Sequence, residues 1–109
     1  MAQRGTFTGT FTADTYRNLV DLFGLGLGGF PQGVQIVGGF LQAQGQGATF
    51  RMVPRGSPAP ATAEGGNTLS AGAGIGLQKT DEWRLDEIWM RNTTAGSNAT
   101  VVFTGTLDG

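Results

Sequence analysis

Hydrophobic and polar residues alternate along several short segments of the chain, which is the pattern of β-strands with one buried face. Residues 5–12 read Gly-Thr-Phe-Thr-Gly-Thr-Phe-Thr, so an extended chain places Phe7 and Phe11 on one side and the threonines on the other. β-Branched and aromatic residues also dominate residues 34–41 and 48–53, and the polar, glycine-rich connection between these two segments predicts a hairpin. The pattern favours an all-β protein.

The clearest strand pattern lies in the last third of the chain, from Trp83 to Thr106. A strand through Trp89 runs into the polar segment 92–98, and the β-branched segment 100–106 follows, so this region also predicts a hairpin. We expect the hairpin to supply much of the core, with Trp89 packed inside. The expected core side chains of this hairpin are Trp83, Leu85, Trp89, Val101 and Phe103.

Two features near the N-terminus interrupt the strand pattern. Apolar residues recur at helical spacing over residues 14–23, which predicts a short helix that Gly24 can end. The glycine-rich segment 24–33 follows. Its glycine spacing is formally that of a dinucleotide-binding turn, but a helical pattern precedes it instead of a strand, so it indicates no nucleotide site. The segment divides an N-terminal arm, residues 1–33, from a β-sandwich domain, residues 34–109.

The middle of the chain holds weaker signals. Prolines and small residues dominate residues 54–66, which predicts an exposed loop with polyproline character. Glycines interrupt residues 69–77, which predicts a weak strand around Ile75 whose backbone bulges or packs close to a neighbour. Residues 103–106 also repeat the sequence of residues 7–10, which indicates equivalent strands at the two ends of the chain.

Composition excludes several classes of function. The 109 residues suit one domain, and 20 glycines with 4 prolines suit short strands joined by turns. The net charge is −1 and the arginines are spread from Arg4 to Arg91, so the sequence shows no clustered basic face for nucleic acid. The chain has no cysteine and no histidine, which excludes disulfides, thiolate or imidazole metal sites and histidine-based catalysis. We therefore expect no cofactor and no metal site.

Acid–base chemistry would require the carboxylates of Asp81, Glu82, Asp86 and Glu87. Neighbouring residues of an extended strand point to opposite faces, so Asp86 and Glu87 are expected to be solvated or salt-bridged rather than paired across a cleft. A small hydrolase built on this cluster is the weakest hypothesis, and the chain is predicted not to be an enzyme. No segment approaches the ~20 apolar residues of a membrane span, and the N-terminus lacks the apolar core of a secretory signal, so we expect synthesis in the cytosol.

The run from Leu85 to Thr106, together with the richness in glycine, threonine and alanine, resembles the closing hairpin of small bacteriophage virion proteins. The resemblance is to capsid decoration or cement proteins and to related head and fibre modules. It implies a compact β-sandwich, often jelly-roll-like and commonly trimeric, that sits in the virion after synthesis in the host cytoplasm. As a homo-oligomer it would bridge neighbouring capsomers by binding the major capsid protein or another virion protein.

We expect the partner contacts to lie outside the C-terminal hairpin. An extended N-terminal arm can add a strand to the sheet of a neighbour, and the proline-rich loop is exposed. The expected partner-binding residues are Arg4, Phe7, Phe11, Pro58 and Pro60. The alternative hypothesis is a receptor- or carbohydrate-binding module of a phage tail or fibre, in which Trp83 or Trp89 stacks on a sugar.

Overall fold

The computed structural model describes residues 3–11, 15–25, 34–54, 57–61, 65–92 and 98–108. The strands within these residues are β1 (Gln3–Phe11), β2 (Arg17–Asn18), β3 (Gln35–Gln44), β4 (Ala48–Met52), β5 (Asn67–Leu69), β6 (Gly74–Gln78), β7 (Ile88–Asn92) and β8 (Ala99–Asp108). The helical elements are the α-helix α1 (Leu19–Leu22) and the 3-10 turns η2 (Lys79–Asp81) and η3 (Leu85–Glu87). The all-β class predicted from the sequence is confirmed.

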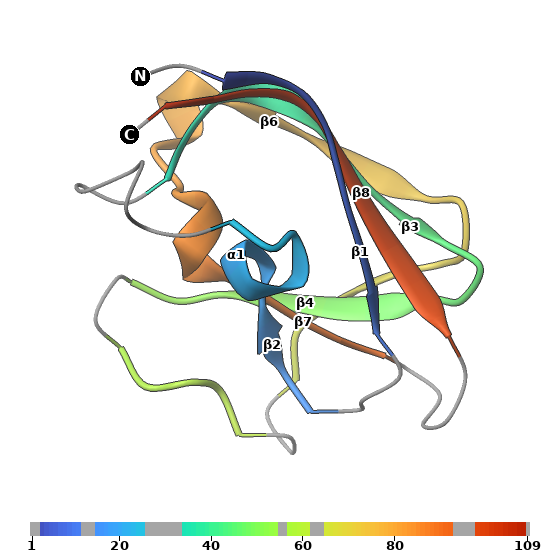
Figure 1. Cartoon of the computed structure of the whole chain (residues 1–109). Helices are drawn as coiled ribbons and strands as arrows, with labels where there is room; N and C mark the ends of the chain where they lie inside the picture. Colours follow the sequence, from blue (N-terminus) through green and yellow to red (C-terminus); the bar gives the residue numbers. More distant parts are fainter. Residues whose placement is uncertain are drawn as a thin grey trace.

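The strands form two antiparallel sheets in the orders β1-β8-β3-β6 and β2-β7-β4-β5, which face each other across the core (Figure 1). β1 pairs with β8, β2 with β7, β3 with β6 and β4 with β5. This nested pairing is the strand order of a jelly roll, in which one long antiparallel ribbon is wrapped into two sheets. The chain is therefore a small β-sandwich with jelly-roll topology.

Both hairpins predicted from the sequence are wrong. β3 and β4, which cover the segments 34–41 and 48–53, lie in opposite sheets, and so do β7 and β8 of the segment 83–106. β3 instead pairs with β6 and β8, and β4 pairs with β5 and β7. The alternating pattern identifies a strand with one buried face but carries no information about its partner, and in a jelly roll these connections cross between sheets.

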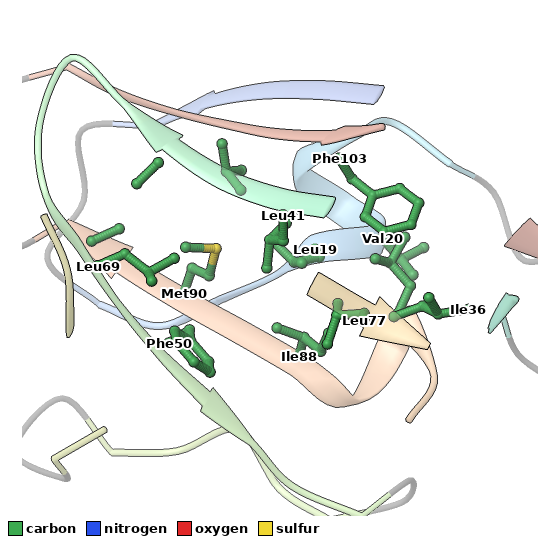
Figure 2. Close-up of a cluster of buried hydrophobic side chains, with 14 of the residues drawn as sticks. Leu19, Val20, Ile36, Leu41, Phe50, Leu69, Leu77, Ile88, Met90 and Phe103 are labelled. Carbon is green, nitrogen blue, oxygen red and sulfur yellow. The ribbon is translucent and has the colours of Figure 1, made fainter. Parts of the chain in front are cut away.

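The core lies between the sheets, and both contribute to it (Figure 2). Leu41 and Phe103 point inward from the first sheet, and Ile88 and Met90 from the second, all four with no exposed surface. Leu19 of α1 is equally buried and extends the core at the end of the sandwich. Burial of such side chains contributes about 1.5–3 kcal/mol each, which is the main source of stability in a chain without disulfides.

The tryptophan segment has a different structure from the one expected. η3 occupies residues 85–87, and β7 begins only at Ile88. Inward and outward positions then alternate along β7, with Met90 buried and Trp89 half-buried on the outer face. Trp89 is thus not packed inside, and Trp83 is also only half-buried. The other three expected core residues, Leu85, Val101 and Phe103, are completely buried.

The described part of the N-terminal third, residues 3–11 and 15–25, belongs to the sandwich and is not a separate arm. β1 pairs with β8 over its whole length, so the boundary expected between residues 33 and 34 does not divide the fold. Both copies of the repeated sequence lie in this pair of strands, where Phe7 is directly opposite Phe103 and their ring centroids are 6.4 Å apart. The expected helix over 14–23 is confined to α1, and Gly24, with a φ of 70°, follows it as predicted. Residues 26–33 of the glycine-rich segment lie outside the described residues.

The glycine-interrupted segment forms the short strand β6, as expected. Its backbone packs close to a neighbour, because a Cβ at Gly74 would lie 2.5 Å from the carbonyl oxygen of Leu41. The missing side chain is therefore needed for β6 to approach β3.

Candidate interaction surface

The outer face of the β1-β8-β3-β6 sheet is the most extensive exposed surface built by the strands. Every second residue of these strands points away from the core, and most of them are exposed or half-exposed. We call this surface the threonine face. It consists of Arg4, Thr6, Thr8, Thr10, Gly38, Phe40, Gln42, Gln44, Gly74, Gly76, Gln78, Thr100, Val102, Thr104, Thr106 and Asp108.

Polar but uncharged groups dominate the threonine face. Its charged residues, Arg4 and Asp108, both lie at the end of the sheet where β1 begins and β8 ends. Hydroxyl groups meet across the strands, with the Oγ1 atoms of Thr10 and Thr100 3.2 Å apart. The amide of Gln42 donates to the carbonyl of Gly72 at 2.9 Å. Such a face can be covered by a partner without the desolvation of ions, which is the most expensive part of burying a polar surface.

Phe40 is the exposed aromatic residue of the threonine face and lies on β3, next to the edge strand β6. Its side chain is 48% exposed, and it is the exposed large hydrophobic residue among those described. The ring lies across β6, because a Cβ at Gly74 would stand 2.6 and 2.7 Å from its Cε1 and Cζ atoms. Phe40 also faces Gly76 directly in the β3–β6 register. The missing side chain of Gly74 thus leaves room for the ring over β6, where it can act as an anchor for a partner.

Sequence analysis missed Phe40 because of a β-bulge. The β3–β8 register shifts between Ile36 and Gly38, so Ile36 and Leu41 both point into the core although five residues separate them. Strict alternation cannot place both of these residues inside, so it does not predict whether Phe40 or Leu41 faces the core. The signal available in the sequence was the pair of glycines at 38 and 39, which indicates irregular pairing.

The outer face of the second sheet is different, since the chain partly covers it with its own residues. Thr49 points outward from β4 yet is only 4% exposed. Pro60 of the β4–β5 loop is buried, and Arg51 Nη1 donates to the carbonyl of Gly65 in the same loop at 2.7 Å. The guanidinium of Arg91 lies 5.5 Å from the centroid of the Tyr16 ring. Arg51 and Arg91 thus both lie on this face, where Arg51 holds the β4–β5 loop and Arg91 packs against Tyr16.

The structure separates the five residues expected to bind a partner. Arg4 is exposed at the end of the threonine face, and Pro58 is exposed in the β4–β5 loop on the other side of the molecule. Phe7 is half-buried on the inner side of β1, while Phe11 and Pro60 are buried. Phe11 and Pro60 are therefore not available as surface anchors, because folding uses their apolar surface within the chain.

The acidic residues near the tryptophans hold backbone groups instead of lining a cleft. A carboxylate oxygen of Asp86 accepts from the backbone N–H of Val34 at 2.9 Å. Glu87 accepts from the N–H of Arg84 at 2.9 Å, and Asp81 accepts from that of Gln78 at 2.7 Å. Asp81 and Glu87 thus hold local turns, and Asp86 links η3 to the residue before β3. The described residues contain no cluster of three acidic side chains able to hold a metal ion.

Comparison with protein-family models, with curated proteins and with solved structures finds no match to this chain. Within the described residues, no helix has the length and apolar character needed to cross a membrane.

Proposed function

We propose that this protein is a non-catalytic structural module of a bacteriophage particle, a decoration or cement protein that bridges neighbouring capsomers of the head. The observation that carries the proposal is the threonine face, a nearly uncharged sheet surface that carries the exposed aromatic residue Phe40. The jelly-roll strand order supports it by analogy, because this topology recurs in viral capsid domains as well as in lectins. The phage assignment itself comes from the sequence resemblance of residues 85–106.

The size and chemistry of the threonine face suit contact with another protein. Strands spaced about 4.8 Å apart, with a rise of about 3.4 Å per residue, give four strands of this length a plan area of roughly 500–600 Å². A standard protein–protein interface buries about 800 Å² on each partner, so the face supplies most of one. The centre of such an interface is depleted of charge and enriched in aromatic residues, as this face is around Phe40.

The test is binding of the purified protein to phage heads prepared without it. We expect saturable binding that makes the heads more resistant to bursting on heating. Phe40→Ser should weaken binding about 10- to 30-fold, since truncation of a central aromatic anchor commonly costs about 1.5–2 kcal/mol. Thr68→Ala is the control, because Thr68 is exposed on β5 of the opposite sheet and lies outside the threonine face. Absence of binding to the heads, or equal loss with both variants, would contradict the proposal.

A carbohydrate- or receptor-binding module of a tail or fibre is the second candidate, and Phe40 is also the observation that favours it. An exposed ring beside the amides of Gln42 and Gln44 combines a stacking surface with hydrogen-bonding groups, which suits a neutral sugar. Half-buried Trp83 and Trp89 offer less ring surface than the sequence-based hypothesis assumed. Calorimetric titration with a panel of glycans distinguishes the candidates, because glycan binding that Phe40→Ser abolishes supports the sugar site.

A further inference from the structure

Within the described residues, the strand β1 pairs with another strand on one side only, so it forms a long edge of its sheet. The four edge strands of the sandwich are β1 and β6 in one sheet and β2 and β5 in the other. Three of them are short, with five residues in β6, three in β5 and two in β2. β1 has nine residues and pairs with β8 without a shift in register. Shortness, bulges, prolines and charges normally protect edges from pairing with another chain, and of these β1 has only the charge of Arg4 near its start.

The sequence of β1 is symmetric about its midpoint. Residues 5–9 read Gly-Thr-Phe-Thr-Gly in either direction, and Phe7 is the central residue of the strand 3–11. An antiparallel pair related by a two-fold axis at Phe7 would place Gly5 opposite Gly9 and Thr6 opposite Thr8. Such an axis aligns all nine residues of both strands. A two-fold axis places residue i opposite residue j and residue j opposite residue i in any such pair, and the palindrome makes the opposing residues identical in type over residues 5–9.

The chain already contains one example of this pairing. On its paired side, β1 contacts the Phe-Thr-Gly-Thr sequence of β8, with Phe7 opposite Phe103 and Thr6 opposite Thr104. A second β1 on the open side would place the same Phe-Thr-Gly-Thr sequence opposite residues 7 to 4, in the same antiparallel direction. It would also cover Phe7, which is half-buried although Phe103, its neighbour on the same inner face, is completely buried. Cross-strand pairs of aromatic residues and of threonines each contribute about 0.2–1 kcal/mol in addition to the backbone hydrogen bonds.

We infer that β1 pairs with β1 of a second copy of this chain, across a two-fold axis at Phe7. The two β1-β8-β3-β6 sheets then form one continuous eight-stranded sheet, and the two threonine faces become one surface. The assembly closes at two copies, in contrast to the three copies that the phage resemblance implies. The inference rests on the fold and on the sequence of β1, and it goes beyond the proposed function. If that function is correct, two linked faces bind a repetitive particle more tightly than one.

Light scattering and analytical ultracentrifugation over a hundredfold range of protein concentration test the inference. We expect a dimer of about 23 kDa, twice the 11.3 kDa of the chain. A variant carrying Thr6→Lys and Thr8→Lys should be monomeric, because two lysines would lie opposite two lysines across the axis. A variant with Thr6→Glu and Thr8→Glu should be monomeric for the same reason. Mixing the two variants should restore the dimer, which a general loss of stability could not produce.

Thr104→Lys is the matched control, because Thr104 is exposed on the same face but belongs to the central strand β8. This variant should remain dimeric. A parent protein that is monomeric at every concentration, a mass of three chains, or a dimer that persists in both doubly charged variants would overturn the inference. Thermal melting of each variant verifies that it folds. If the protein is not a dimer, the head-binding test with Phe40→Ser can still be carried out, so the two proposals are tested independently.

Discussion

Substitution of Gly105 by alanine should destabilise the protein strongly, for a reason visible only in three dimensions. Gly105 lies on the inner side of β8, with Gly5 opposite it on β1 and Gly39 opposite it on β3. A Cβ at position 105 would collide with the carbonyl oxygen of Gly38 and would lie 2.6 Å from the Cα of Gly39. These are backbone atoms of a strand paired on both sides, so they cannot rotate away as a side chain would.

The expected loss follows from this overlap. Overpacking typically costs about 1–3 kcal/mol, and a clash with paired backbone belongs at the upper end of that range. Replacement of glycine also lowers the conformational entropy of the unfolded chain, which offsets the loss of stability by about 0.4–1 kcal/mol. We therefore expect Gly105→Ala to lower the free energy of unfolding by about 2–3 kcal/mol and the melting temperature by roughly 10–20 °C. Urea unfolding followed by the fluorescence of half-buried Trp83 and Trp89 measures the change.

Gly5→Ala is the matched control for this prediction. Gly5 lies in the same row of residues as Gly105, but a Cβ there would have no atom within 4 Å. The variant should be as stable as the parent, or more stable by up to about 1 kcal/mol, because only the restriction of the unfolded chain remains. Equal unfolding midpoints for Gly105→Ala and the parent, or equal losses for the two variants, would refute the steric reasoning.

Three further substitutions test the fold by urea unfolding. Phe103→Ala should cost about 3–5 kcal/mol, because the ring is completely buried between the sheets; a loss below 1 kcal/mol would contradict its central position. Asn18→Ala should cost about 1–2 kcal/mol, since its side chain caps α1 and donates to the carbonyl of Asp86 at 2.7 Å. Met90→Ala should cost about 2–5 kcal/mol and more than Trp89→Ala, because Met90 faces the core. The reverse order would contradict the orientation of β7.

Local patterns in the sequence were sufficient for the strand class and for several elements. Alternation of phenylalanine and threonine over residues 5–12 indicated β1, and glycines within 69–77 indicated a strand that packs close to a neighbour. Both features depend on residues adjacent in the chain. The repeated sequence at 7–10 and 103–106 was also informative, because the two copies lie in paired strands with Phe7 opposite Phe103.

The same reasoning failed where the outcome depends on contacts between distant segments. Leu41 is buried and Phe40 exposed because a bulge after Ile36 reverses the alternation of β3. Trp89 lies outside the core because η3 delays the start of β7 and determines which residues face inward. Pro60 was expected on the surface but is buried in the β4–β5 loop.

Residue types and their local period are enough to predict short strands with one apolar face, a core without disulfides and a chemistry without histidine or cysteine. The folded arrangement is needed to show which strands pair, that the two predicted hairpins are divided between sheets, and that Phe40 is exposed on a nearly uncharged face. Pairing and sidedness depend on the packing of both sheets around one core, and an alternating pattern is compatible with many such arrangements.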